Sequence, residues 1–475
     1  ARDSQVGFLR EFKKFYASDQ GLKPLEINYL TKDGAEFSSE IVASPILEEG
    51  KVVGTRGIVR DISMRVKAEE ILRQAKLSAE QALNVAERDL EIGREIQLGF
   101  FPQEMPEIPG WEIATFFQAA RQVSGDFYDV FPIDHTPYTC MVVADVCDKG
   151  VGAAMFMVLL RSLIRANSER YQKDEPAQMA MHMARSVNHY IVHTHGQSNM
   201  FATLVLAILD PASRRLHYVN GGHDAPLLID ARGQIRQTLE STGPAVGFTT
   251  DLAFEADSIE FGPGDVLLAY TDGFTEARNA SGEFYGEECF SLEAAGEWTS
   301  AFSAVKHLEL AVFSHMAGQP QSDDLTLLAL RLNLENEAPC HGLTLQAEMD
   351  QLPTLRSFAG EVCQLLQVRE KTRDSVKLVV DEICSNIIMH GYQDRERGTI
   401  RVSLEKHKEE LVMTVEDQGQ AFDPMVLEDP PLSEDIHERK IGGLGVFLVR
   451  ELADQIDYER KNGSNRLTVK IKLET

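Results

Sequence analysis

The chain has 475 residues, of which 43% are hydrophobic and 25% charged, so its length fits about three soluble globular domains. Lys and Arg number 47 against 74 Asp and Glu, and the net charge of −27 excludes broad binding to nucleic acid or to anionic membranes. No apolar run approaches the ~18 residues that span a bilayer. The six cysteines form no Cys-x-x-Cys pair, so we expect reduced thiols and a cytoplasmic location.

Residues 26–62 predict β-hairpins, because alternating strands near 27–30, 37–45 and 52–59 are separated by glycine turns. The segment closes on Arg60-Asp61-Ile62-Ser63. This layout resembles the C-terminal half of a PAS sensor domain. The resemblance implies a partial PAS domain over residues 1–63, with a helix from Phe8 to Tyr16. A small β-meander with no sensory role is the alternative.

Residues 64–101 predict a helical linker, since the segment is rich in Ala, Glu, Arg and Leu and has no proline before Pro102. Small and apolar residues recur three and four apart along it, at Leu72, Ala75, Ala79, Ala82, Ala86, Leu90 and Gly93. This spacing predicts a parallel coiled coil and therefore a homodimer. A single amphipathic helix packed on its own protein is the alternative.

Residues 102–334 carry carboxylates at the ends of apolar strands. Asp145 and Asp272 each follow such a run, Asp323 precedes one, and Asp126 lies in a Ser-Gly-Asp segment. Carboxylates that converge repel strongly, and a hard divalent cation such as Mg²⁺ or Mn²⁺ removes that repulsion. The pattern therefore predicts metal-assisted hydrolysis rather than a Ser or Cys nucleophile. Two helices are expected between the strands, near 151–170 and 176–195.

Five motifs occur in order in this region: Ser124-Gly125-Asp126-Phe127-Tyr128-Asp129, Ala144-Asp145-Val146-Cys147-Asp148-Lys149-Gly150, Tyr218-Val219-Asn220-Gly221-Gly222-His223, Tyr270-Thr271-Asp272-Gly273-Phe274-Thr275-Glu276 and Ser322-Asp323-Asp324-Leu325-Thr326. The ordered set resembles the SpoIIE/RsbU branch of the metal-dependent Ser/Thr protein phosphatases, the PPM superfamily. The resemblance implies an α/β-β/α sandwich with two Mn²⁺ or Mg²⁺ ions in its cleft. It assigns the ions to Asp126, Asp145, the Val146 carbonyl, Asp272 and Asp323.

The motifs depart from the family pattern before Lys149, and the role of His223 is open. Cys147 and Asp148 replace the small Ser-Gly pair that is usual before the lysine. Asp148 either alters the metal preference or faces solvent, and we expect it to face solvent. His223 either shapes its loop or contacts the substrate phosphate, and we expect the loop role.

Residues 340–475 predict a further α/β unit, with strands near 343–348, 399–405 and 410–416, helices at 353–367, 371–391 and 444–455, and a last strand pair. Glu382, Asn386 and His390 are four apart, so they share one helix face. A carboxylate and an amide one turn apart suit a base beside a Mg²⁺ ligand. Asp417 then follows a strand, and Gly442-Gly443-Leu444-Gly445 opens a helix whose N–H groups can hold phosphates.

This second set resembles the GHKL (Bergerat-fold) ATPases, in particular the anti-sigma-factor serine kinases of the RsbW/SpoIIAB type. The resemblance implies an α/β sandwich that binds ATP and Mg²⁺. It gives Asn386 the Mg²⁺, Asp417 the adenine amine and Glu382 the role of general base, with Gly419, Gly443 and Gly445 shaping the pocket and lid and Thr468 near adenine. The alternative is an ATP-binding module that sequesters a partner without phosphorylating it.

The whole chain is therefore predicted to be a multidomain α+β regulator of the partner-switching kind: partial PAS domain, coiled-coil linker, phosphatase and kinase-like ATPase. The resemblances imply a phosphorylated STAS-type anti-sigma-factor antagonist as substrate, and a sigma factor as a further candidate partner. No nucleic acid and no membrane are expected as partners of this segment.

Overall fold

The structure is a computed structural model. It describes residues 24–30, 36–49, 51–250, 253–334, 339–392, 396–421, 423 and 444–473. The chain divides into two compact units, Ala1–Ile92 and Gly93–Thr475, each of which is described by itself.

The first unit contains an antiparallel sheet in the order β1-β2-β3, formed by β1 (Leu25–Leu30), β2 (Glu36–Glu48) and β3 (Lys51–Asp61). This confirms the predicted hairpins. Their assignment to a PAS domain stays a prediction, and the helix expected at 8–16 lies outside the described residues.

The predicted linker is one long helix, α2 (Ser63–Leu98). Asp61 stabilises its first turn, because its carboxylate accepts the Ser63 N–H at 2.8 Å. The helix ends before Pro102, as expected. Its side chains from 67 to 89 are exposed, including Ile71 and Leu72. The helix is thus confirmed, and its pairing with a second copy stays a prediction.

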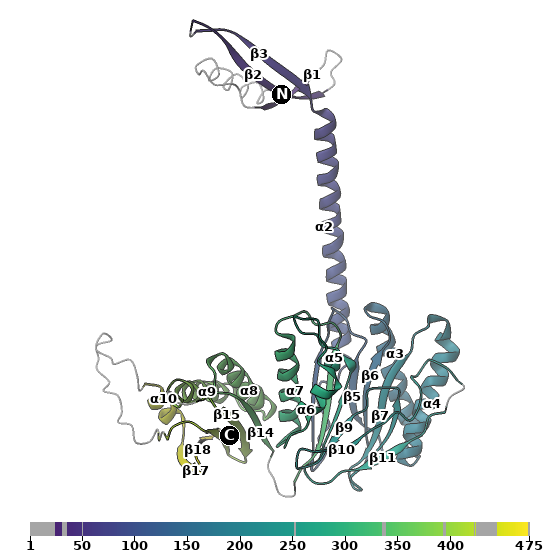
Figure 1. Cartoon of the computed structure of the whole chain (residues 1–475). Coiled ribbons are helices and arrows are strands. Elements are labelled where there is room, and N and C mark those ends of the chain that lie inside the picture. The colour runs from purple at the N-terminus through teal and green to yellow at the C-terminus, as the bar shows by residue number, and fades with distance from the viewer. Residues whose placement is uncertain are drawn as a thin grey trace. The chain divides into compact units, whose positions relative to one another are not determined.

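The phosphatase region is a sandwich of two five-stranded sheets (Figure 1). One sheet has the order β10-β9-β12-β13-β4, with strands Ile235–Thr238, Leu227–Ile229, Val266–Tyr270, Leu325–Leu332 and Trp111–Gln118. The other has the order β11-β8-β7-β6-β5, with strands Asp257–Glu260, Arg215–Gly221, Ala202–Asp210, Thr139–Val146 and Phe127–Pro132.

Both faces of these strands are buried, which explains their unbroken apolar runs. In β6, Val142 and Ala144 pack against the helices α3 (Val151–Tyr171) and α4 (Pro176–His195), whereas Met141 and Val143 pack against the other sheet. Helices α6 (Gly286–Ala294) and α7 (Ala301–Met316) cover the opposite side. The predicted α/β-β/α sandwich is therefore confirmed, and so are the two helices expected near 151–170 and 176–195.

Helix α3 is the one described helix that is long and apolar enough to cross a membrane. Its apolar face, including Phe156, Met157, Leu160 and Ile164, is buried in the core of the sandwich. Burial of this kind is typical of a core helix, and it explains why α3 is rich in apolar residues.

The ATPase region is a five-stranded antiparallel sheet in the order β14-β15-β16-β18-β17. Its strands are Cys340–Gln346, Thr399–His407, Glu410–Asp417, Ser464–Lys472 and Gln455–Lys461, and its helices are α8 (Leu352–Leu365), α9 (Glu370–His390) and α10 (Leu444–Leu452). All the predicted elements are confirmed, with ends shifted by a few residues. One hydrophobic core joins the sheet to the three helices.

Helix α7 of the phosphatase sandwich contacts the ATPase region. The ammonium group of Lys306 lies 2.9 Å from the Glu361 carboxylate in α8. The Gly342 N–H of the edge strand β14 donates to the Ser303 hydroxyl at 2.8 Å. The rings of Phe302 and Phe358 lie with their centroids 5.9 Å apart and are tilted by 34°.

Candidate functional site

The two sheets carry the predicted carboxylates to one end of the sandwich. Asp145 is the penultimate residue of β6. Asp272 begins the short helix α5 (Asp272–Thr275), which follows β12. Asp323 lies two residues before the start of β13. Strands β12 and β13 are antiparallel, with Tyr270 opposite Leu327. The end of one strand therefore meets the start of the other, which brings Asp272 and Asp323 together.

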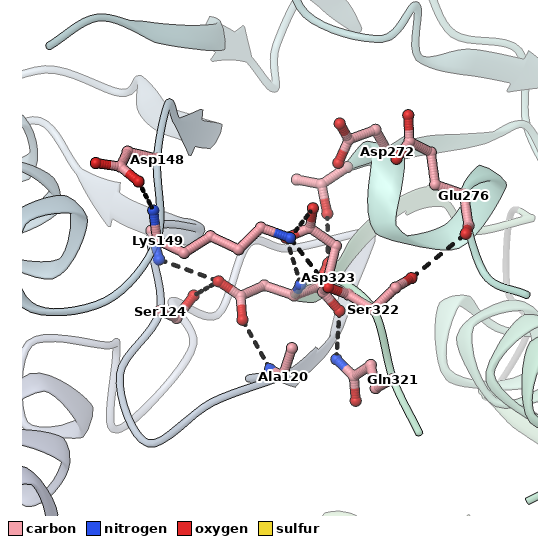
Figure 2. Close-up of polar contacts among 12 residues, drawn as sticks. Ala120, Ser124, Asp148, Lys149, Asp272, Glu276, Gln321, Ser322 and Asp323 are labelled. Atoms are coloured by element: carbon pink, nitrogen blue, oxygen red, sulfur yellow. Dashed lines mark hydrogen bonds and ion pairs between the residues drawn. The ribbon is translucent and has the colours of Figure 1, made fainter. Parts of the chain in front are cut away.

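Three carboxylates lie close enough to share a cation. Oxygens of Asp272, Glu276 and Asp323 all lie within 4.8 Å of one another (Figure 2). Glu276 follows Asp272 by four residues, one helical turn, so it presents its carboxylate on the same side. The set offers only oxygen donors, and such a set fits a hard divalent ion such as Mg²⁺ or Mn²⁺.

Asp126 and Asp145 form the buried part of the site. Burial, the Asp145 charge and the Asp145 hydrogen bond hold the pKa of Asp126 well above its usual range. Burial likewise raises the pKa of Asp145 to about 6, with smaller contributions from the Asp323 and Asp324 charges. The Thr326 hydroxyl donates to Asp126 at 2.9 Å and fixes its carboxylate. Buried carboxylates with raised pKa values favour a nearby cation, because the cation offsets both desolvation and repulsion.

Asp272, in the less buried part of the site, also has a raised pKa. Burial raises the pKa of Asp272 to about 7, and the Asp145 and Asp323 charges add to it. The Val146 carbonyl lies close to the backbone of Gly125, in the Ser-Gly-Asp segment. A Cβ built on Gly125 would lie 3.0 Å from the Val146 carbonyl oxygen. The structure thus gathers all five residues expected from the sequence at one end of the sandwich, and their oxygen donors are of the kind that divalent ions prefer.

Asp324 anchors the loop beside the site through hydrogen bonds. Its two carboxylate oxygens accept the Ser124 hydroxyl at 2.6 Å, the Gly125 N–H at 3.0 Å and the Ala120 N–H at 2.7 Å. The side chain is 7% exposed. It therefore anchors the segment that carries Asp126 to the start of β13.

The residues that depart from the family pattern take the expected positions. Asp148 is exposed, and its carboxylate accepts the Lys149 N–H at 2.8 Å. His223 is buried, and its Nδ1 shares a 2.8 Å hydrogen bond with the Thr203 hydroxyl. Burial lowers the pKa of His223 to about 4, so the ring is neutral near pH 7 and shapes its loop.

Two further acids belong to the site and were not predicted from the sequence. Glu276 lies four residues after Asp272, and this spacing was a usable signal. Asp224 follows the Gly-Gly-His segment; burial raises its pKa to about 6, and the Glu287 and Glu276 charges contribute. Its charge also raises the pKa values of Asp145 and Asp272. Only the fold brings Asp224 to this end of the sandwich.

The ATPase region contains a cavity of about 340 Å³ between α9, α10 and the sheet. Asp417 lies on its wall and is 6% exposed. One carboxylate oxygen of Asp417 accepts the Gly419 N–H at 2.7 Å and the Asn465 amide at 3.0 Å, which leaves the other for a ligand. Apolar side chains complete the walls, among them Ile383, Ile387, Val446, Val449 and Leu467. An apolar slot with one fixed acceptor fits a purine base with an exocyclic amine.

The other predicted ATP-site residues are placed as follows. Asn386 and His390 line the cavity, and Glu382, on the same helix, does not. A Cβ on Gly419 would lie 2.8 Å from the Gly391 carbonyl, so the chain needs glycine there. Gly445 lies in the first turn of α10.

Thr468 is not among the described residues that line the cavity. It lies on β18 (Ser464–Lys472) opposite Thr414, whereas Asn465 on the same strand lines the cavity. Gly443 and the acidic loop from 424 to 440 lie outside the described residues.

Comparison with known proteins separates the same two regions. Residues 136–333 match the family described as stage II sporulation protein E (SpoIIE), and residues 345–471 match the family described as histidine kinase-like ATPase domain. Protein IcfG of Synechocystis sp. is 36% identical over 266 residues, which are 52% of this chain and 42% of that protein. The phosphoserine phosphatase RsbP of Bacillus subtilis is 28% identical over 39% of this chain and 45% of its own length. The chain thus spans less than half the length of these two relatives.

An anti-sigma F factor of Clostridium novyi is 30% identical over 25% of this chain and 83% of that protein. A solved structure of the RsbU and RsbW domains of Rv1364c from Mycobacterium tuberculosis covers 78% of this chain and 94% of that one, at 22% identity and a TM-score of 0.41.

The chain thus combines a sandwich that matches the SpoIIE family over residues 136–333 with a region that matches the histidine kinase-like ATPase domains. Through this second region the chain belongs to the family of the anti-sigma F factors.

Proposed function

We propose that this chain is a metal-dependent protein serine/threonine phosphatase of a bacterial partner-switching pathway, acting in the cytoplasm. The observation that carries the proposal is the convergence of Asp126, Asp145, Asp272 and Asp323 at one end of the sandwich, three of them with raised pKa values. When bound there, divalent ions supply a hydroxide near neutral pH and neutralise the phosphoryl oxygens.

The protein's own residues bind and orient in this reaction. Asp145 and the Val146 carbonyl would hold the ions together with Asp126 on one side of the site and with Asp272 and Asp323 on the other side. The hydrogen bonds of Thr326 and Asp324 hold the Asp126 segment in place. No covalent phosphoenzyme is required, because the nucleophile is water.

The direct test of phosphatase chemistry is hydrolysis of a generic phosphoester with Mn²⁺ or Mg²⁺ against EDTA. Wild-type protein should hydrolyse it only with metal, and Asp145→Asn should not. Asp257→Asn, an acid on the distant edge strand β11, is the matched control and should retain the activity. Hydrolysis unchanged by Asp145→Asn would instead indicate a degenerate phosphatase scaffold.

The substrate that we propose is a phosphoserine or phosphothreonine on a STAS-type anti-sigma-factor antagonist. Support comes from the presence of both domains in one chain, since the relatives include a phosphoserine phosphatase and an anti-sigma F factor. In this proposal the ATPase domain is a kinase that opposes the phosphatase, with Glu382 as its general base and Asn386 as its Mg²⁺ ligand.

A second reading makes the ATPase domain a binding module only. The ATPase domain would bind a sigma factor, and the phosphatase would determine how much of the ATPase domain is occupied by it. Transfer of label from ATP to a STAS protein separates the two: Glu382→Ala should stop transfer and spare ATP binding if the domain is a kinase. Transfer that persists in this variant would contradict the general-base assignment.

We also propose that the linker helix regulates the phosphatase by changing its pairing with a second copy in a homodimer. Support comes from the last turn of α2, where Gln97 is hydrogen-bonded to Ser124. Deletion of residues 64–93 should change the phosphatase rate without abolishing metal binding. Regulation that survives the deletion unchanged would contradict the idea.

A further inference from the structure

The loop between β6 and α3 directs a lysine into the carboxylate site. Asp148 and Gly150 both have left-handed backbone conformations, with φ of 74° and 90°. These two residues flank Lys149, and the turn sends its side chain across to the loop before β13 (Figure 2). There the ammonium group lies 2.6 Å from Asp323 Oδ2 and donates to the Ser322 carbonyl at 3.0 Å.

Lys149 is paired with one of the carboxylates that an ion would use. The other oxygen of Asp323, Oδ1, accepts the Asp324 N–H at 2.9 Å, so both oxygens of this carboxylate already have a partner. An oxygen of Asp323 also lies within 4.8 Å of ligand oxygens of Asp272 and Glu276. A divalent ion bound by this trio would lie close to the ammonium group, and the repulsion between the two cations favours release of the ammonium from Asp323 when the ion binds.

We propose that Lys149 is a built-in counter-ion that competes with the divalent metal for Asp323 and so lowers the metal affinity of the Asp272–Asp323 side of the site. Lys149 is a positioning residue in this sense, because it acts through Asp323. The proposal rests on the two-ion site of the proposed function. It adds that metal occupancy on this side is set by an exchange between an internal ammonium group and the ion.

Competition by an internal lysine has a definite consequence. The Lys149 side chain is 38% exposed and that of Asp323 is 24% exposed, so the ammonium can swing into water without leaving a buried charge behind. The metal-free site is then partly neutralised, and the ion must displace Lys149 to bind. The phosphatase would need a higher metal concentration than the carboxylates alone would require.

The test is direct titration with Mn²⁺, measured by electron paramagnetic resonance of the free ion, in which no substrate takes part. Lys149→Met removes the charge and keeps the chain length, and it should tighten binding of one ion by about fivefold, the size of a partly exposed ion pair. Lys149→Arg keeps the charge and should bind Mn²⁺ as the wild type does. Lys173→Met, the same charge change after the end of α3, is the matched control and should leave the affinity unchanged.

Equal or weaker Mn²⁺ binding by Lys149→Met, in protein that melts as the wild type does, would overturn the proposal. Tighter binding by Lys173→Met as well would also overturn it, since the effect would then be one of net charge. An absence of Mn²⁺ binding by the wild-type protein would contradict both the metal site and the proposed competition. Wild-type protein that binds Mn²⁺ in an Asp145-dependent way but hydrolyses no phosphoester would refute the proposed function and leave the competition to be decided by the titration.

Discussion

Gln97 and Ser124 exchange two hydrogen bonds across the base of the carboxylate site. The Gln97 amide donates to the Ser124 carbonyl at 2.7 Å, and the Ser124 N–H donates to the Gln97 side-chain oxygen at 3.0 Å. Gln97 lies in the last turn of α2 and is 5% exposed, and Ser124 begins the segment that carries Asp126. The linker helix is thus bonded to the same loop that Asp324 anchors.

Gln97→Ala should lower both the stability and the metal affinity of the phosphatase domain. The variant leaves two buried backbone groups of Ser124 unpaired, which costs about 1–3 kcal/mol each. We expect a lower melting temperature in EDTA and weaker Mn²⁺ binding. Glu95→Ala, on an exposed side of the same turn, is the control and should match the wild type. A Gln97→Ala protein with unchanged metal affinity would show that the bond to Ser124 does not position Asp126.

Gly273→Ala should abolish the site. A Cβ at Gly273 would lie 1.9 Å from the Asp324 carbonyl oxygen, so the turn after Asp272 and the loop before β13 could not approach each other. We expect loss of Mn²⁺ binding and destabilisation by about 3 kcal/mol or more, as for other overpacked positions. Gly152→Ala has open space around its Cβ in helix α3 and should be neutral or stabilising by about 0.5–1 kcal/mol. Metal binding by Gly273→Ala equal to that of the wild type would contradict the close approach.

The stability of the metal-free protein should fall as the pH rises from about 4 to about 7. The pKa of Asp145 is raised from 3.8 to about 6 and that of Asp272 from 3.8 to about 7. A folded state that holds these protons more tightly than the unfolded chain is stabilised fully below the unfolded pKa, and this contribution is lost as the pH rises through the folded pKa. Mn²⁺ should reverse the loss.

Thermal melting in EDTA at pH 4.5 and 7.5 measures this effect. Asp272→Asn removes one of the groups, so its melting temperature should fall less over this range than that of the wild type. An equal fall in both proteins would mean that Asp272 does not contribute.

Asp417→Asn should weaken ATP binding by more than about tenfold, because an amide in place of the carboxylate offers a different set of donors and acceptors to the adenine amine. Glu416→Gln on the same strand is the matched control: its side chain lies near Arg466, at 3.2 Å, and does not line the cavity. Isothermal titration with ATP and Mg²⁺ measures both. Equal affinities would remove Asp417 from the nucleotide site.

The sequence predicted most of the phosphatase fold, because buried strands such as β6 and β12 read as apolar runs and their ends carry the acids. Asp145, Asp272 and Asp323 could therefore be placed in advance. The contact of Lys149 with Asp323 could not, since it depends on two left-handed residues in one turn and on a loop 174 residues away. The anchoring role of Asp324 depends likewise on the pairing of distant segments.

In the ATPase domain, strand alternation decides between two candidates. Asn465, Leu467 and Val469 are buried, so they share the inward face of β18, whereas Thr468 lies on the opposite phase. A polar residue in phase with buried neighbours was the signal for Asn465. The place of Thr468 near adenine, which the family resemblance implies, stays a prediction.

The measurement that tests the central claim most directly is phosphate release from a phosphorylated STAS protein, with Mn²⁺ or Mg²⁺ against EDTA, by wild type and Asp145→Asn. The account predicts metal-dependent release by the wild type that is lost in EDTA and in the variant. Release that is the same in both proteins, or no release by a wild-type protein that binds metal, would contradict it.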